Sequence, residues 1–595
     1  MNNNTKPFLA TTAIEDFWET SRHVIFLGNW CKRYSRREYW QNLDSETLPS
    51  YFNEEEKHRV YLYLNSVFER LLPVLSKQMN QIHGADFSVK YWRIILGAWL
   101  VNYIHVIYDR YNSLKHFLTF HPDFTSVCLD EECFVTPKDT IHFFCHIRND
   151  DYNLQVYSRI LSALGYKLPT KKLPVFVPDV NMYFFGKNEL IKNILKYFYE
   201  ALNKTFFNKN QVFLRSTFFT HSNLMELFLK TKGAVRSCIY GYEDLPDFSV
   251  DYPARASLKK CDFGENDFER ILMELIPLEM PKNMIEGLSF LRKKVENKFI
   301  PAPKAIMSSI SWWFENVFQA WAADAAEKGT LLLGVQHGGN YGIAEDFFQE
   351  DLELSIVDIY YSWGWNQNHA GAKVVPMPAP KLVKSKKKYT GKSAEILYVL
   401  TSYPRYLYQF PWSTDYWENY FSNQVLFLSR LSEEVMARLR VRPHREDFGW
   451  DIKERLKDSF PELRIENWDI PFSESLNDCS LYICDHPLQS TTFIESLVSN
   501  KPTVLFYNPA FAANAVRPEA ADLFGKLEKS AILFGDPVSA ARHLNAVYAS
   551  IGNWWNEPER QKVVKRFLGV YGKTSSTWLA EWSAEILNLS NNRIN

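Results

Sequence analysis

Short apolar runs alternate with amphipathic stretches along most of this chain. Residues 12–15 (TAIE) have the form of a capping box, which predicts a helix beginning near Ala13, and residues 23–27 (HVIFL) are typical of a strand. Between residues 54 and 111 the apolar positions recur at helical spacing, which predicts a block of long helices. A single amphipathic helix is expected over residues 311–328.

Two series of short apolar runs, each interspersed with helical patterns, follow the helical block. Strands that alternate with helices are typical of parallel βαβ units, because the crossover between parallel strands is usually a helix. The expected strands are residues 175–177, 212–214, 305–307 and 330–335 in the first series, and 395–400, 441–444, 463–466, 481–484, 503–506 and 532–534 in the second.

A proline- and lysine-rich segment, residues 376–392 (PMPAPKLVKSKKKYTGK), separates the two series. Because 595 residues exceed what one hydrophobic core can hold, we interpret this segment as a domain linker. The expected fold is α/β and GT-B-like, with two Rossmann-like domains. They are an acceptor-side domain over residues 1–375, with a helical insertion at about 54–115, and a nucleotide-sugar-binding domain over residues 393–595 that ends in helices.

The composition limits the possible partners and cofactors. Lys and Arg number 68 against 69 Asp and Glu, so the net charge of -1 gives no general attraction to nucleic acid, and none is expected as a partner. The eight cysteines are scattered and form no C-x-x-C pair, which disfavours a structural zinc, and no cofactor or metal is expected. A cytoplasmic location is expected, because the N-terminus lacks a signal-peptide pattern and no apolar run reaches about 20 residues.

The basic part of the linker is the segment that could touch an anionic membrane surface or a lipid-linked diphosphate. A solvated linker explains the same lysines and is the favoured interpretation. Peripheral contact with the inner face of the membrane is therefore an open alternative.

The most informative stretch of the second series is residues 481–508 (LYICDHPLQSTTFIESLVSNKPTVLFYN). An expected strand ends there at Asp485-His486-Pro487, and Thr492 to Glu495 has the form of a capping box that opens a helix. The start of a helix offers free backbone N–H groups, which suit a phosphate. Because ligands of doubly wound domains bind at the carboxyl ends of strands, we predict a donor site here, although an ordinary capped helix is the alternative. Its predicted members are His486, Ser490, Thr491, Thr492 and, as acceptor for ribose hydroxyls, Glu495.

Three further basic residues of the second series are candidates for the donor site. Arg442 and His444 lie in the run RPHREDFGW, and Arg517 follows a later loop. Arginine forks match phosphate oxygens, so they could neutralise a leaving phosphate without a metal ion. A basic surface turn is the alternative interpretation of the RPH segment.

The sharpest signal in the first series is a glycine-rich turn directly after the strand expected at 330–335. Paired glycines allow the backbone to approach a ligand closely, and His337 could donate to a phosphate or carry a proton. A turn whose histidine only satisfies a backbone carbonyl is the alternative. The donor-binding candidates of the turn are Gln336, Gly338 and Gly339; the catalytic candidates are His337, Glu345 and Asp346, and Asp150 and Asp151 are further acidic residues that could lie near such a cleft.

Several of these motifs resemble a bacterial family of surface-polysaccharide transferases over nearly the whole chain. The resemblance rests on FLATT (8–12), FLGNWC, QHGGNYG, YYSWGW (360–365), RPHREDFGW and STTFIE. More distantly, the second domain is similar to capsule Kdo transferases and polyol-phosphate transferases, which pair a basic HP-type loop with a Ser/Thr-rich helix start near a glutamate. Either His486-Pro487 or the RPH segment could match that loop.

The resemblance implies a glycosyltransferase that takes a sugar from a nucleotide donor. Metal independence is predicted from the residues instead, because the expected phosphate site consists of a helix start and cationic side chains with no D-x-D-type pair at a strand end beside it. A CMP-activated ulosonic acid is one implied donor, and a UDP- or GDP-sugar is equally compatible. The implied acceptor is a surface glycan or a lipid-linked glycan. The alternatives are a polyol-phosphate transferase, a nucleotide-sugar epimerase or hydrolase, and a non-catalytic glycan-assembly protein.

Overall fold

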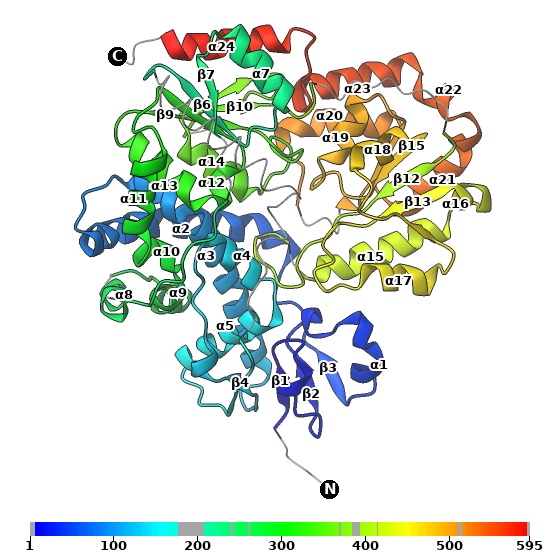
Figure 1. Cartoon of the computed structure of the whole chain (residues 1–595). Helices are drawn as coiled ribbons and strands as arrows, with labels where there is room; N and C mark the ends of the chain where they lie inside the picture. Colours follow the sequence, from blue (N-terminus) through cyan, green and yellow to red (C-terminus); the bar gives the residue numbers. More distant parts are fainter. Residues whose placement is uncertain are drawn as a thin grey trace.

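A computed structural model shows the chain as two α/β halves joined by a helical block, with a small third sheet near the N-terminus (Figure 1). The expected strand at 175–177 falls, except for its first residue, outside the part that the structure describes. The described residues are 6–175, 208–238, 242–259, 262–367, 371–383, 393–412, 414–509 and 514–591.

The first half is built on a six-stranded parallel sheet with the order β11-β10-β9-β8-β6-β7. The order changes direction between β6 and β8, so this is the switch point of the sheet. Central strands are buried on both faces, which explains why their sequences are continuously apolar. The strands are β6 (Val212–Arg215), β7 (Val235–Ser237), β8 (Ala305–Ser308), β9 (Leu331–Val335), β10 (Ile359–Ser362) and β11 (Lys373–Pro376).

The second half contains a parallel sheet with the order β14-β13-β12-β15-β16-β17. Numbered from its own first strand, this is the order 3-2-1-4-5-6 of dinucleotide-binding Rossmann sheets. Its switch point lies between β12 and β15, which pair directly from Ile396 with Leu481 onward. The strands are β12 (Ile396–Val399), β13 (Leu439–Arg442), β14 (Arg464–Ile465), β15 (Leu481–Cys484), β16 (Thr503–Phe506) and β17 (Leu533–Phe534). The expected α/β, GT-B-like fold with two Rossmann-like domains is confirmed.

The helical block is an antiparallel pair, α2 (Lys57–His83) and α3 (Val89–Phe120). Gly84, in the left-handed conformation, ends α2, and the Ser88 hydroxyl caps α3 by accepting from the amide of Tyr91 at 3.1 Å. Most of α3 is buried, because it packs against α2 and against the helices α13 and α14 of the first half.

The remaining helices lie over the two sheets, around the helical block and, in one case, beside the small N-terminal sheet (Figure 1). Those of the first half are α1 (Arg37–Trp40), α4 (Thr140–His146), α5 (Asp150–Ala163), α7 (His221–Lys230), α8 (Tyr252–Leu258), α9 (Asp267–Glu279), α10 (Lys282–Ile285), α11 (Leu288–Lys298), α12 (Ser311–Phe314), α13 (Asn316–Ala326) and α14 (Phe348–Ile356). Those of the second are α15 (Thr414–Ser429), α16 (Glu433–Arg438), α17 (Ile452–Ser459), α18 (Phe472–Asn477), α19 (Thr492–Val498), α20 (Pro518–Lys529), α21 (Pro537–Val547), α22 (Ile551–Trp555), α23 (Pro558–Tyr571) and α24 (Trp578–Asn591).

Two helix predictions are wrong. The capping-box pattern at residues 12–15 precedes only a short 3-10 turn, Glu15–Phe17, within a parallel sheet of β1 (Phe8–Ala10), β2 (Val24–Phe26) and β3 (Ser45–Thr47). The helix expected over 311–328 is broken into α12 and α13 at Glu315, whose carboxylate accepts from the Arg215 guanidinium at 2.7 and 2.9 Å. In both places tertiary contacts override the local pattern.

The chain crosses between the halves twice. The first crossing is the expected linker, of which residues 384–392, including most of its lysines, lie outside the described residues. The second is the return of α24 to the first half, where Trp582, Ile586 and Leu589 pack on the sheet face that β6 and β9 present (Figure 1). The indole of Trp582 donates to the carbonyl of Pro378 at 2.9 Å.

Candidate active site

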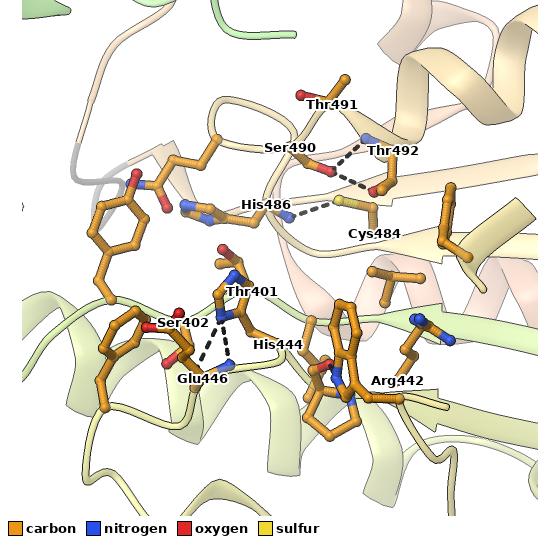
Figure 2. Close-up of a pocket in the computed structure, with 18 of the residues that line it drawn as sticks. Thr401, Ser402, Arg442, His444, Glu446, Cys484, His486, Ser490, Thr491 and Thr492 are labelled. Carbon is orange, nitrogen blue, oxygen red and sulfur yellow. Dashed lines mark hydrogen bonds between the residues drawn. The ribbon is translucent and has the colours of Figure 1, made fainter. Parts of the chain in front are cut away.

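A cavity of about 680 Å³ lies at the switch point of the second sheet, at the carboxyl ends of β12, β13 and β15 (Figure 2). This is the place where open α/β sheets bind ligands. Polar side chains from three segments far apart in sequence meet there. Among the predicted donor-site residues, those that line it are Arg442, His444, His486, Ser490, Thr491, Thr492 and Glu495.

The start of α19 carries three hydroxyl groups, those of Ser490, Thr491 and Thr492, which form the hydroxyl cluster. The Ser490 hydroxyl lies 2.7 Å from that of Thr492 and accepts from the Thr492 amide at 3.2 Å, and the Thr492 hydroxyl also contacts that of Tyr482 at 2.6 Å. The expected capping box does not form, because Thr491 has helical backbone angles and the Glu495 carboxylate pairs with Lys381 at 2.7 Å. The hydroxyls are thus held in place by one another rather than by the helix.

Behind the cavity, Asp485 is a buried carboxylate surrounded by hydrogen-bond donors. It accepts from the hydroxyls of Tyr398 at 2.6 Å and Tyr420 at 2.9 Å, and from the amide of Gln424 at 3.2 Å. Burial raises its pKa to about 6, although these hydrogen bonds oppose the shift. They fix the turn that carries His486 into the cavity.

His486 presents a neutral imidazole to the cavity. Its Nδ1 lies 2.7 Å from the hydroxyl of Tyr416, and burial lowers its pKa to about 3. At neutral pH the ring is therefore uncharged and acts as a hydrogen-bond donor or acceptor, not as a cation.

We predict that Asp485 makes the protein less stable as the pH rises. Its pKa is raised above the unfolded value of 3.8, so its stabilising contribution is full below that pH and is lost as the pH rises through about 6. Between about pH 4 and about pH 7 the loss is about 2 kcal/mol. Urea unfolding of wild type and Asp485→Asn at both pH values checks this: the difference between the two proteins should change with pH, and parallel profiles would contradict it.

The two predicted basic residues after β13 differ in their surroundings. Arg442 is only 2% exposed; it pairs with Glu466, donates to the Ser475 hydroxyl at 3.1 Å and stacks over Trp468 at 4.3 Å. Its charge is already matched by Glu466. His444 accepts from the amide of Glu446 at 3.2 Å, and burial lowers its pKa. Figure 2 shows its ring between Thr401 and Glu446.

The glycine-rich turn of the first half touches the hydroxyl cluster directly. The amide of Gly339 donates to the Thr491 hydroxyl at 3.0 Å, and a Cβ at this glycine would lie 2.5 Å from the carbonyl oxygen of Ser490. Gln336 is buried and has a structural role. Its side-chain N–H donates to the carbonyl of Gly338, and its side-chain oxygen accepts at 2.7 Å from the backbone amide of Trp363, the residue after β10. Only a glycine at 339 allows the two halves to meet this closely.

His337 belongs to a buried hydrogen-bonded group beside this turn. Its Nε2 lies 3.1 Å from the Glu353 carboxylate and 2.7 Å from the Tyr341 hydroxyl, and its ring stacks on Phe218. Glu353 is 1% exposed and also accepts from the indole of Trp313 at 2.7 Å. With Nε2 turned to Glu353, Nδ1 is the nitrogen available for other chemistry.

The other predicted residues lie outside the cavity lining. Asp346 accepts from Nδ1 of His58 at 2.8 Å, and burial raises its pKa. The backbone amide of the neighbouring Glu345 donates to the backbone carbonyl of Ala515 at 3.0 Å. Arg517 pairs with buried Glu350 at 2.9 Å, so it joins the halves rather than reaching the cavity. Asp150 and Asp151 begin α5 and are not among the lining residues; the Asp150 carboxylate accepts from the Arg405 guanidinium at 2.5 Å.

Several residues that line the cavity were not predicted from the sequence. Thr401 and Ser402 directly follow β12, so the switch-point rule applied to that expected strand could have found them. Trp468, which is 37% exposed, follows β14. Arg148 comes from the first half, and no sequence signal joins it to the second.

Within the described ranges, no group of three or more His, Cys, Asp or Glu side chains is arranged to hold a metal ion. No helix within the same ranges is both long and apolar enough to cross a bilayer.

The sheet orders and the switch-point cavity define a two-domain enzyme of the GT-B architecture. Within that class the chain belongs to the LIC12162 family of transferases, whose model matches residues 7–586. A comparison with curated proteins finds no match.

Two solved structures of glycosyltransferases show a remote likeness. One is CalG4, the calicheamicin glycosyltransferase, with 12% identity, a TM-score of 0.30 and coverage of 65% of this chain and 99% of its own. The other is WaaG, a glycosyltransferase involved in lipopolysaccharide biosynthesis, with 10% identity, a TM-score of 0.29 and coverage of 64% and 100%. At these TM-scores the fold assignment rests on the strand order of the chain itself.

Proposed function

We propose that this transferase moves a sugar from a nucleotide-activated donor to a surface-glycan or lipid-linked acceptor. The observation that carries the proposal is the cavity at the switch point of a sheet with the order 3-2-1-4-5-6, lined by the hydroxyl cluster of Ser490, Thr491 and Thr492. Such hydroxyls and the adjacent backbone amides are suited to phosphate oxygens.

In the proposed complex the donor phosphate lies against the hydroxyl cluster and His486. Thr401 and Ser402, on the opposite wall, add hydroxyls from the first turn after β12. The nucleoside lies toward Trp468, whose exposed ring offers a stacking surface. Glu495 accepts from the ribose once it parts from Lys381. A CMP-activated ulosonic acid fits this proposal as the donor, with UDP- and GDP-sugars as the competing donors.

The proposed reaction uses His337 as the base. Nδ1 takes the proton of the acceptor hydroxyl while that oxygen forms a bond to the anomeric carbon, and the bond from this carbon to the donor phosphate breaks with its electrons on the phosphate. The buried carboxylate of Glu353 stabilises the imidazolium that results. Hydroxyls and neutral imidazole stabilise the leaving phosphate, so the proposed turnover is metal-independent.

We expect Ser490→Ala combined with Thr492→Val to weaken donor binding by about 10- to 100-fold, because hydrogen bonds to a charged group contribute about 1.5–3 kcal/mol. Calorimetric titration with the donor measures the effect. Ser422→Ala, which removes an exposed hydroxyl on α15, is the control and should bind as wild type. Unchanged affinity in the double variant would move the phosphate away from α19.

The function itself is tested by incubating the protein with CMP-, UDP-, GDP- and CDP-activated sugars, with and without a glycan acceptor, in the presence of EDTA. A nucleotide released only when the acceptor is present supports glycosyl transfer. Release without an acceptor indicates a hydrolase or epimerase, and transfer that EDTA abolishes contradicts metal independence.

A further inference from the structure

One turn of the first half, Arg148 to Asp150 at the start of α5, reaches the cavity of the second domain. Asn149 and Asp150 lie where the helix begins, and Arg148 just before it. Arg148 is among the residues that line the cavity. The turn therefore adds first-half side chains to a site otherwise built at the carboxyl ends of second-domain strands.

Arg148 is in contact with two second-domain residues that also line the cavity. Its Nη1 donates to Glu446 at 3.1 Å, and its guanidinium lies over the ring of Phe448 at 5.2 Å. Figure 2 shows Glu446 next to His444 and Ser402, with Arg442 farther along the cavity wall. A guanidinium keeps its charge at every physiological pH and presents a planar fork of N–H donors, the shape that matches carboxylate and phosphate oxygens.

The charge of Arg148 differs in setting from that of Arg442. Arg442 is 2% exposed and pairs with the equally buried Glu466, whereas the Arg148 side chain is 19% exposed and faces the cavity. The lining carries three side chains that are cationic at physiological pH, Arg148, Lys381 and Arg442, whereas burial keeps His486 neutral.

Asp150, two residues later, holds the loop that forms the wall after β12. It accepts from the Arg405 guanidinium at 2.5 Å, from the Tyr406 hydroxyl and from the amide of Ala13 at 3.1 Å. Arg405 and Tyr406 lie between Pro404 and Tyr408, both of which line the cavity.

The same loop, residues 400–412, makes two further hydrogen bonds to the helical block. The Arg110 guanidinium donates to the carbonyl of Leu407, and the Phe410 amide donates to Nδ1 of His105 at 2.9 Å. One side of residues 400–412 thus forms cavity wall while the other is bound to the first half. The position of this wall depends on the junction with the first half.

We infer that the turn Arg148–Asp150 is a donor-recognition element supplied by the first half, an inference that rests on the proposed function. Arg148 binds an anionic oxygen group of the donor, either its phosphate or a carboxylate on its sugar. Asp150 is a positioning residue that holds the loop 400–412 against that donor.

The test compares Arg148→Met and Asp150→Asn with wild type by calorimetric titration at a temperature well below unfolding. The probes are CMP and CMP-N-acetylneuraminic acid, together with UDP, UDP-glucose and UDP-glucuronic acid. Both variants should bind the preferred donor about tenfold or more weakly, as expected for loss of a charge-assisted contact. A loss already seen with CMP or UDP assigns Arg148 to the phosphate, and a loss confined to the acidic sugars assigns it to the carboxylate.

Asp458→Asn is the matched control. Asp458 also joins the two halves, through the Tyr34 hydroxyl at 2.8 Å and Arg37 at 2.7 Å, but it does not touch the loop or the cavity. Its donor affinity should equal that of wild type. Equal losses in Asp458→Asn and Asp150→Asn would mean that Asp150 only stabilises the junction, which overturns its positioning role.

Unchanged binding of every probe by Arg148→Met overturns the recognition role while the proposed function stands. A wild-type protein that binds none of these nucleotides contradicts the proposed function, and this inference fails with it. Glycosyl transfer that persists unchanged in both variants also overturns the recognition role, because transfer requires an occupied donor site.

Discussion

Replacing His337 by alanine is expected to lower turnover by about 100- to 10,000-fold, the range that a general base contributes. Nε2 is committed to Glu353 and Tyr341, so Nδ1 is the nitrogen that can take the acceptor proton. Because His337 does not line the donor cavity, donor affinity should stay within about twofold of wild type. Single-turnover kinetics with saturating donor and acceptor measures the rate, and calorimetry measures the affinity.

Two companion variants make this result specific. Glu353→Gln keeps a hydrogen-bond acceptor but removes the charge that stabilises the imidazolium, so its turnover should fall less than that of His337→Ala. Tyr341→Phe removes a neutral hydroxyl that contacts both His337 Nε2 and the Glu353 carboxylate but leaves the charge of Glu353 in place, and its loss should be smaller still. A His337→Ala enzyme that turns over at the wild-type rate would reduce the glycine-rich turn to a structural role.

Replacing Arg517 by methionine is expected to destabilise the protein by about 3–5 kcal/mol, as found when one partner of a buried ion pair is removed. Glu350, its partner at 2.9 Å, is fully buried, and burial raises its pKa to about 7 in spite of Arg517. Without the guanidinium this carboxylate loses its charge partner, and the backbone carbonyl of Ala344 loses two donors. The free energy of unfolding in urea measures the loss.

A second substitution separates the charge effect from lost packing. Adding Glu350→Gln to Arg517→Met removes the uncompensated carboxylate, so the double variant should be more stable than Arg517→Met alone. Equal stability of the two would show that the contacts of Arg517 with Ala344 and Gln367, rather than its charge, hold this junction.

The sheets could be predicted because their strands are short apolar runs buried on both faces. Residues 481–484 form β15 with the expected bounds. The run expected at 441–444 forms β13 two residues earlier, ending at Arg442, since Pro443 has no N–H to continue the ladder. The helix breaks could not be predicted in the same way, because Arg215, which draws Glu315 out of its helix, is 100 residues away in sequence.

The residues of the candidate site also differ in whether the sequence could reveal them. The hydroxyl cluster and His486 could be found because they are adjacent in sequence and follow one strand. Glu353 and Arg148 could not, since nothing local distinguishes a glutamate on α14 or an arginine before α5 from a solvated residue. Gly339 shows an intermediate case: the sequence predicts close backbone approach, and the structure gives the partner as the Ser490 carbonyl instead of a ligand.

The packing of α24 on the first sheet also affects how the chain folds during translation. Val212, Leu333 and Tyr361 belong to strands made early, yet they share a core with Trp582 and Ile586. On the ribosome one apolar face of the first sheet is therefore covered only in part, by α7, until some 200 further residues, counted from Tyr361 to Trp582, have been translated. Such a face is a site for aggregation or for a chaperone, so a nascent chain stalled between the two crossings should depend on chaperones far more than the released protein does.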